Sequence, residues 1–180
     1  MHRKGDLIQT FCGLPFWPMD PRSEEVEIVD IAHALSNQCR FTGHSRAFYS
    51  VAQHAYHVSN ICNPDDALWG LLHDAAEAYV CDLARPMKHQ PEYAHYCRDE
   101  QLVMAAICKR FGLAPTMPES VHRADEIMLA SEVLSLMTPD RSVWGRWIDA
   151  VPPEWRIKVF PVGPGEAKEL FMTRFKELTR

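Results

Sequence analysis

The feature that most constrains this chain is the stretch from residue 71 to 82, where a histidine and carboxylates interrupt an apolar run. Read as a helix, it places His73 and Glu77 on one face, one turn apart. Asp74 lies about 100° around from His73, so both can reach one ion. The apolar flanks would turn this edge toward a core, where an unpaired charge is costly. A divalent metal would supply the partner, and imidazole with carboxylate suits Zn, Mn, Fe or Co; a plain His73–Asp74 hydrogen bond is the structural alternative.

Composition narrows the class of protein. A chain of 180 residues predicts one domain, residues 1–180, and its net charge of −5 and pI near 6.0 count against a duplex nucleic-acid binder. The six cysteines form no C-x-x-C pair, which favours reduced thiols and a cytoplasmic protein over a zinc knuckle or a disulfide scaffold. No apolar run approaches the length of a membrane span, and no signal peptide is expected.

Hydrophobic periodicity predicts an all-α domain preceded by a short hairpin or extended arm over 7–19. We expect a second early helix to be capped by Ser45 and to bury Phe48. The proline-rich stretch 152–164 is expected to be a connector. The helices predicted besides the motif helix cover 28–37, 45–61, 92–110 (ended by Gly112), 118–137 and 166–178.

Two further residues are candidate ligands. His54 lies on the helix before the motif, where a lone histidine is more often an ordinary core or surface residue; His57, one turn later, is assigned to that ordinary class. Asp125 lies on a helix among apolar positions. Its structural alternative is an ion pair with Arg110 or Arg123.

In order, His54, His73-Asp74 and Asp125 resemble the H…HD…D pattern of HD-domain metal phosphohydrolases. The motif continues as Glu77, then Asp-Leu-x-x-Pro-x-Lys over 82–88, which is similar to the 5′-deoxynucleotidase branch although residue 84 is Ala where Pro is common. The segments 39–44 and 49–54 resemble a compact phage and prophage subgroup that includes dATP triphosphohydrolases. Guanosine-tetraphosphate hydrolases carry HDxxED, and Ala follows Glu77 here.

The resemblance implies a role for each matching residue. In the bacterial 5′-deoxynucleotidases an aromatic residue, commonly Trp, follows the arginine that corresponds to Arg40. Its ring packs in the place that a ribose 2′-hydroxyl would occupy. In this chain the residue is Phe41. Such a ring would leave that hydroxyl unpaired, at roughly 1–3 kcal/mol. The implied assignments are His54, His73, Asp74 and Asp125 as metal ligands, Glu77 as general base, Asp82 as acid or substrate-positioning group, and Arg40, Phe41 and Lys88 as substrate-binding residues.

The resemblance therefore implies hydrolysis of the 5′ phosphoester bond of deoxynucleotides, with dATP or another dNTP as the favoured substrate and the di- and monophosphates also accepted. Two alternatives stay open: a 5′-deoxynucleotidase restricted to dNMP, and a non-catalytic, metal-stabilised domain that binds nucleotides and regulates a partner. The implied cofactor is Zn, Co or Mn, with Mg accompanying the phosphates as a further option. The implied partners are a deoxynucleotide and further copies of the chain, with no duplex nucleic acid and no membrane; the implied location is the cytoplasm, that of the host if the protein is phage-encoded.

Overall fold

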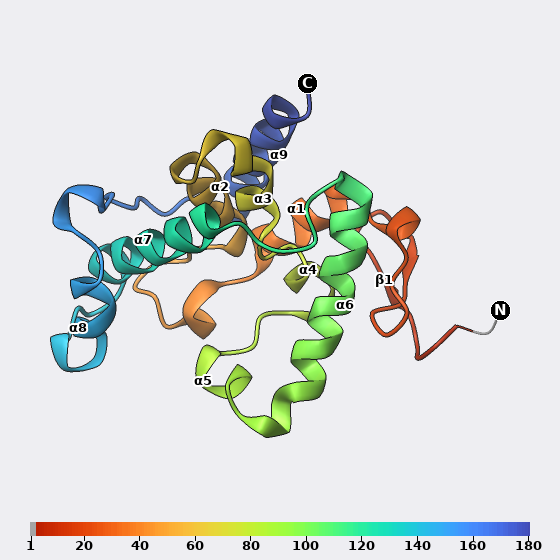
Figure 1. Ribbon diagram of the computed structural model, residues 1–180, viewed down its shortest axis with the longest axis horizontal. Coiled ribbons are helices and arrows are strands. Elements are labelled where there is room, and N and C mark those ends of the chain that lie inside the picture. The colour runs from red at the N-terminus through yellow and green to blue at the C-terminus, as the bar shows by residue number, and fades with distance from the viewer. Residues whose placement is uncertain (1–2) are drawn as a thin grey trace.

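The computed structural model describes residues 3–180, which are mostly helical (Figure 1). The predicted hairpin over 7–19 is confirmed as two short antiparallel strands, with Ile8 opposite Phe16. In chain order the elements are β1 Ile8–Gln9, β2 Pro15–Phe16, η1 Ser23–Glu25, α1 Ile28–Asn37, η2 Arg40–Gly43, α2 Val51–Ile61, η3 Pro64–Asp66, α3 Ala67–Leu72, α4 Glu77–Val80, α5 Arg85–Lys88, η4 Pro91–Tyr93, α6 Ala94–Phe111, α7 Glu119–Leu136, α8 Arg141–Asp149, η5 Pro153–Trp155 and α9 Pro164–Leu178.

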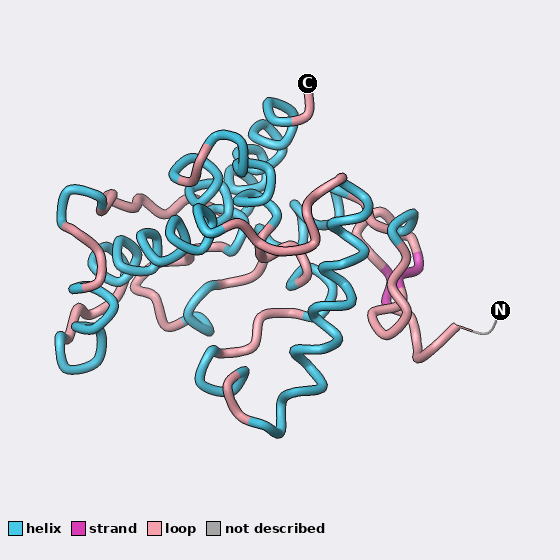
Figure 2. Tube along the Cα trace, viewed as in Figure 1, coloured by secondary structure: helices cyan, strands magenta, loops and turns pink. Residues whose placement is uncertain are grey.

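Helix α2 is the centre of the packing, because it contacts α1, α3, α7 and α9. Helix α6 runs along one side of the molecule, and α8 lies at the opposite end (Figure 1). The proline-rich connector returns from α8 to α9 as an irregular segment (Figure 2). The buried Gln53 of α2 ties it down by donating to the Phe160 carbonyl (2.7 Å) and accepting from the Val162 N–H (3.0 Å).

The long helices match their predictions because their ends carry clear signals. Helix α6 ends at Gly112, which takes the left-handed conformation (φ 68°), and Pro118 precedes α7. The predicted start of α2 at Ser45 is wrong. Ser50 is the cap, accepting from the Gln53 N–H, and the side chain of Phe48 is exposed. The Ser45 hydroxyl instead donates to the Ala47 carbonyl, which is part of a loop.

The prediction of one continuous motif helix over residues 71–82 is also wrong. Helix α3 ends at Leu72, residues 73–76 form tighter turns, and α4 begins at Glu77. The turns are held by i→i−3 bonds such as Ala75 N–H to the Leu72 carbonyl and Glu77 N–H to the Asp74 carbonyl, each 3.0 Å. Such a tightened stretch inside a helical run often marks a functional position.

Two short helices were not predicted. Pro86 was expected only to interrupt the chain, but it lies in the first turn of α5, where its missing N–H costs nothing. Helix α8 is started by Asp140, whose carboxylate accepts from the Ser142 N–H at 2.8 Å.

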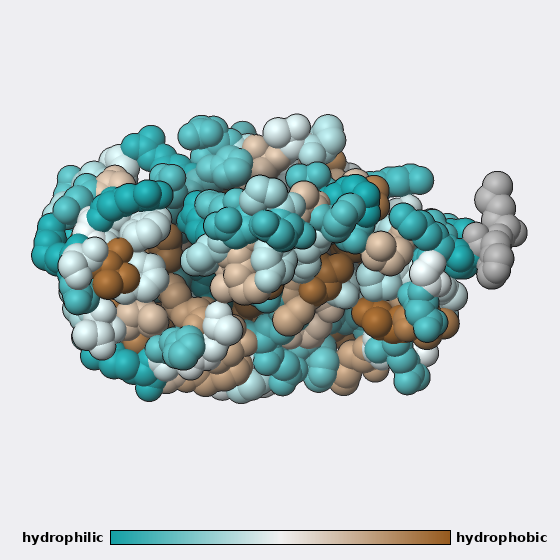
Figure 3. All heavy atoms as spheres, turned by 90° about the horizontal axis from the view of Figure 1, so that it is seen from below, coloured by the Kyte–Doolittle hydropathy of each residue, from teal (hydrophilic) through white to brown (hydrophobic). Residues whose placement is uncertain are grey.

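The N-terminal hairpin carries apolar side chains on the surface. Leu7, Ile8, Phe11 and Leu14 are exposed there. Apolar side chains accordingly gather beside the N-terminal segment at the right-hand end of Figure 3. Within residues 3–180, no helix combines the length and the apolar character that crossing a membrane requires.

Candidate metal site

Three separate parts of the chain bring nitrogen and carboxylate acceptors to one point. His54 comes from α2, His73 and Asp74 from the turn after α3, and Asp125 from α7. The Nε2 atoms of the two histidines are 3.2 Å apart. Asp74 Oδ2 lies 3.2 Å from His73 Nε2 and 3.7 Å from His54 Nε2, and Asp125 Oδ1 lies 3.2 Å from His54 Nε2.

His54, His73 and Asp74 could hold a metal ion, because their ligand atoms all lie within 4.8 Å of one another. Asp125 joins this group through its contact with His54. The alternative ion pairs of Asp125 are not found: Arg110 donates to the Val26 carbonyl, and Arg123 lies over the Trp155 ring.

The other nitrogen of each imidazole determines where its proton lies. His73 Nδ1 is 2.8 Å from the Gly70 carbonyl, which can only accept, so Nδ1 carries the hydrogen. His54 Nδ1 lies 2.6 Å from Glu132 Oε1. Burial alone would raise the pKa of Glu132, but Arg40 and His54 hold it below its usual value, so Glu132 is a carboxylate and Nδ1 donates to it.

With both Nδ1 atoms protonated, neutral imidazoles would face each other through two Nε2 lone pairs, beside two carboxylates. Four converging acceptors need a cation among them, either a proton or a metal ion. Without a metal, a proton takes this place: burial and Arg40 oppose it, but Glu132 and Asp125 raise the pKa of His54 to about 9. A metal ion that binds here must therefore displace that proton.

Glu132, which sequence reasoning missed, supports this arrangement. It is fully buried on α7, and its two oxygens are divided between partners. Oε1 accepts from His54, while Oε2 lies 3.2 Å from both Nε and Nη2 of Arg40. The remaining guanidinium nitrogen, Nη1, is 3.5 Å from Asp74 Oδ2. A signal was present, because Glu132 follows Asp125 by seven residues and so shares its face of α7.

A second group of charges surrounds Glu77. Lys88 Nζ lies 3.5 Å from Glu77 Oε1, 3.5 Å from Asp82 Oδ1 and 2.9 Å from Glu100 Oε1. Burial lowers the pKa of Lys88, but Glu100 and Glu77 outweigh it, so the pKa is raised and the ammonium stays charged. Glu77 Oε2 is buried and makes no hydrogen bond in the described chain. Burial, reinforced by Asp74, raises the pKa of Glu77 well above its usual value.

Glu100 is the second residue of these charged groups that the sequence analysis did not single out. A glutamate on a long amphipathic helix is expected to lie at the surface. Its neighbour one turn back, Tyr96, donates its hydroxyl to the Cys81 carbonyl. The two residues therefore tie α6 to the segment between α4 and α5, which carries Asp82 and leads to Lys88.

Phe41 follows Arg40 in a strained loop. Its backbone is left-handed (φ 53°, ψ 31°), as is that of Thr42, a costly conformation for residues other than glycine. The half-buried Phe41 ring lies 5.7 Å from the Arg40 guanidinium and meets Trp144 of α8 edge-on, at 6.1 Å between ring centroids. The structure thus brings Arg40 to the histidine–aspartate cluster and sets Phe41 beside Arg40.

Fold and site together define a helical protein in which two buried histidines meet two partly exposed aspartates. No family model matches the chain. It is 40% identical over 174 residues to the uncharacterized protein YfdR of Escherichia coli K12, in an alignment that covers 96% of both chains. It is also 35% identical over 115 residues to an uncharacterized protein of Rhodobacter capsulatus, covering 59% of this chain and 58% of that protein. The chain belongs to the YfdR family.

Proposed function

We propose that this protein is a metal-dependent phosphohydrolase of the HD type that cleaves the 5′ phosphoester bond of 2′-deoxynucleotides. The observation that carries the proposal is the cluster of His54, His73, Asp74 and Asp125. Its histidines turn their Nε2 atoms to one point because Glu132 and the Gly70 carbonyl accept from their Nδ1 atoms, and a bound metal ion would displace the proton that His54 otherwise carries there. The resemblance of the H…HD…D motif and of the stretch after it supplies the reaction class.

The donor set fits a divalent transition metal. Two imidazole nitrogens and two carboxylate oxygens suit Zn, Co or Mn, and each histidine has the outer partner that metal-binding histidines usually have. When bound, such an ion would polarise a phosphoryl oxygen and lower the pKa of an attacking water.

Glu77 is the candidate general base. Its carboxylate is buried three residues after Asp74, with Oε2 free of hydrogen bonds, so one oxygen is available to accept a proton from water. Lys88 orients the other oxygen and offsets its charge. Lys88 already faces three carboxylates, so we assign it to positioning Glu77 and Asp82 and not to binding phosphate. Asp82 remains the candidate for the leaving oxygen or the sugar 3′-hydroxyl.

Arg40 can still take part in phosphate binding, although it is partly occupied. A guanidinium has five N–H donors. Two point to Glu132 and one faces Asp74, which leaves two for phosphate oxygens. Phe41, beside Arg40, would then pack against the deoxyribose and disfavour a 2′-hydroxyl.

Within this class we favour a deoxynucleoside triphosphohydrolase that also accepts the di- and monophosphates and works as a homo-oligomer. The alternatives are an enzyme restricted to dNMP and a non-catalytic nucleotide-binding regulator. The free carboxylate oxygen of Glu77 favours an enzyme, because a binding domain does not need a group that can take a proton.

The test is to incubate the purified chain with dATP, dADP or dAMP and Co²⁺ or Mn²⁺, and to measure deoxyadenosine, triphosphate and phosphate. Asp74→Ala should lose both the bound metal, measured by elemental analysis, and the turnover. Asp65→Ala, an exposed carboxylate outside the cluster, is the matched control and should retain both. Stoichiometric metal in Asp74→Ala would refute the ligand set, and nucleotide binding without products would favour the regulator.

A further inference from the structure

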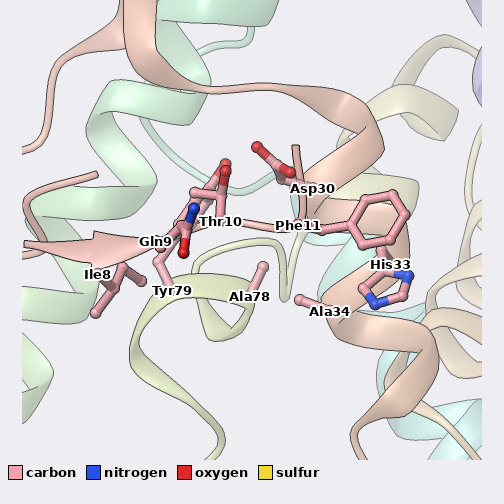
Figure 4. A pocket seen from close by; sticks show the side chains of 9 residues that line it. All are labelled: Ile8, Gln9, Thr10, Phe11, Asp30, His33, Ala34, Ala78 and Tyr79. Carbon is pink, nitrogen blue, oxygen red and sulfur yellow. The ribbon is translucent and has the colours of Figure 1, made fainter. Parts of the chain in front are cut away.

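A separate cavity of about 280 Å³ lies between the N-terminal hairpin, α1 and α4 (Figure 4). None of its lining residues belongs to the histidine–aspartate cluster or to the group around Lys88. Figure 4 shows Asp30 beside Gln9 and Thr10, and Phe11 packed on His33 at the other end. Its polar lining residues are Gln9, Thr10, Asp30, His33 and Tyr79.

Asp30 is the unusual residue of this cavity. Its side chain belongs to the first turn of α1, and the residue is only 3% exposed. One oxygen, Oδ1, accepts from the Cys12 N–H at 2.7 Å, which fastens the hairpin to the helix. The other, Oδ2, is buried and makes no hydrogen bond in the described chain. Within residues 3–180 no Lys, Arg or His nitrogen forms an ion pair with it.

A buried carboxylate without a counter-charge is costly. The N-terminus of α1 offsets part of that cost. The Cys12 thiol lies close as well, and hydrogen bonding to Asp30 raises its pKa; a thiol is a weak donor. Neither group supplies a strong donor to Oδ2, so Asp30, which lines the cavity, keeps a buried acceptor without a partner.

Tyr79 adds a second buried polar group to the lining, with the Glu27 backbone as its nearest polar neighbour. It is 6% exposed, its ring stacks on Phe16 at 3.9 Å, and its buried hydroxyl makes no hydrogen bond of normal geometry in the described chain. Burial raises the pKa of Tyr79, so the hydroxyl stays protonated and can either donate or accept.

The opposite wall of the cavity, around Phe11, is preformed. The Phe11 ring stacks on His33 with 3.7 Å between centroids, and the Lys168 ammonium lies 4.2 Å from the same ring. Both contacts hold an otherwise exposed aromatic side chain in place. Ala34 and Ala78 leave room between this wall and the carboxylate.

We infer that this cavity is a second binding site, which takes a small organic cation with a primary ammonium group. The ammonium would pair with Asp30 Oδ2 and the Tyr79 hydroxyl, and its apolar body would lie against Phe11, Ala34 and Ala78. A carboxylate disfavours anions. A hard metal ion requires six or more oxygen ligands, and the buried part of this cavity offers one carboxylate oxygen and one phenol.

Benzylamine is a suitable probe, with benzyl alcohol as the neutral analogue and benzoate as the anionic one. Calorimetric titration of the full chain should show saturable binding of benzylamine, weaker binding of benzyl alcohol and none of benzoate. Amide shifts in ¹⁵N spectra should centre on residues 9–12, 30–34 and 78–79. Metal content should not change, so the result is independent of the proposed hydrolase.

Asp30→Asn is the decisive variant. Its amide oxygen can keep the bond from Cys12, so the hairpin should stay attached, while the charge that holds the ammonium is lost. Benzylamine affinity should fall by about 10-fold or more, because a charge-assisted bond is replaced by a neutral one. Tyr79→Phe should weaken binding less and keep the stacking on Phe16. Asp6→Asn, an exposed carboxylate of the same segment, should have no effect.

Two results would overturn the inference. One is benzylamine binding of equal strength in wild type and in a folded Asp30→Asn. The other is the absence of saturable binding to wild type, which would identify the cavity as a water-filled gap beside a structural aspartate.

Discussion

Glu132→Gln tests the reasoning about the site most directly, because it changes a residue that touches no proposed substrate. The two carboxylate oxygens serve different partners: Oε1 accepts from His54 at 2.6 Å and Oε2 from Arg40 at 3.2 Å. A glutamine has one oxygen, so its amide group must face a donor on one side. In either orientation Arg40 loses its charged partner, and where the NH2 faces Arg40 the guanidinium keeps only the 3.5 Å contact with Asp74.

The magnitude depends on burial. Removing one partner of a buried ion pair costs about 3–5 kcal/mol, and the amide oxygen recovers one hydrogen bond worth about 1 kcal/mol. The free energy of unfolding should therefore fall by about 2–4 kcal/mol. Loss of an outer partner of a histidine ligand should also lower metal affinity by about 10–100-fold.

Urea unfolding in the presence of a chelator measures the first effect, and competition with a chromophoric chelator measures the second. Glu126→Gln, an exposed glutamate of the same helix, is the matched control and should change stability by less than about 0.5 kcal/mol. The double variant with Arg40→Met should lose less than the sum of the single losses, because each single change leaves the other charge unpaired. Additive losses, or a Glu132→Gln variant as stable as the control, would show that the pair does not support the site.

Three further substitutions test the general base, the sugar contact and the helix packing. Glu77→Ala should keep its metal and lower the turnover of dATP by about 10²–10⁴-fold, as expected for a general base; a near-normal rate would move that role to Asp82. Phe41→Ala should narrow a preference for dATP over ATP that we expect to be about 10-fold or more in kcat/KM, whereas an unchanged ratio would make the ring a packing residue. Gly70→Ala should destabilise the α2–α3 contact by about 1–3 kcal/mol, because its Cβ would lie 2.8 Å from Cys62 Sγ; Gly163→Ala, which meets nothing within 4 Å, should be neutral by the same urea measurement.

Most long helices could be predicted because their ends and faces carry strong signals. The bounds of α1 match the prediction because Ile31, Ala32 and Leu35 are all buried. Helix α8 was missed although its apolar residues share one face, because the segment is short and only Gly145 and Ile148 of its residues are buried. The break in the helix after Leu72 was not predicted for another reason. Turns with i→i−3 hydrogen bonds and an α-helix place small apolar residues in nearly the same positions, so hydrophobic periodicity does not distinguish the two conformations.

The candidate site divides in a similar way. His54, His73, Asp74 and Asp125 were identified from a motif, and the structure brings them together. Partners are harder to predict than ligands, because a sequence shows the charge of a side chain but not what faces it. Arg40 and Lys88 were therefore assigned to phosphate alone, although the fold pairs both with carboxylates.

Helix α7 connects the fold to the candidate site. It carries Asp125, which faces the cluster, and Glu132, which fixes the proton of His54 on Nδ1. Because the two are seven residues apart on one face, they keep their places only while α7 holds its rotation against α2. Ser131 and Ser135 of α7 accept backbone N–H groups of the connector, at Ile157 and Val159, and α2 holds the same connector through Gln53. The connector thus fixes α7 to α2, and the acceptor geometry of the site depends on a segment that contributes no ligand to it.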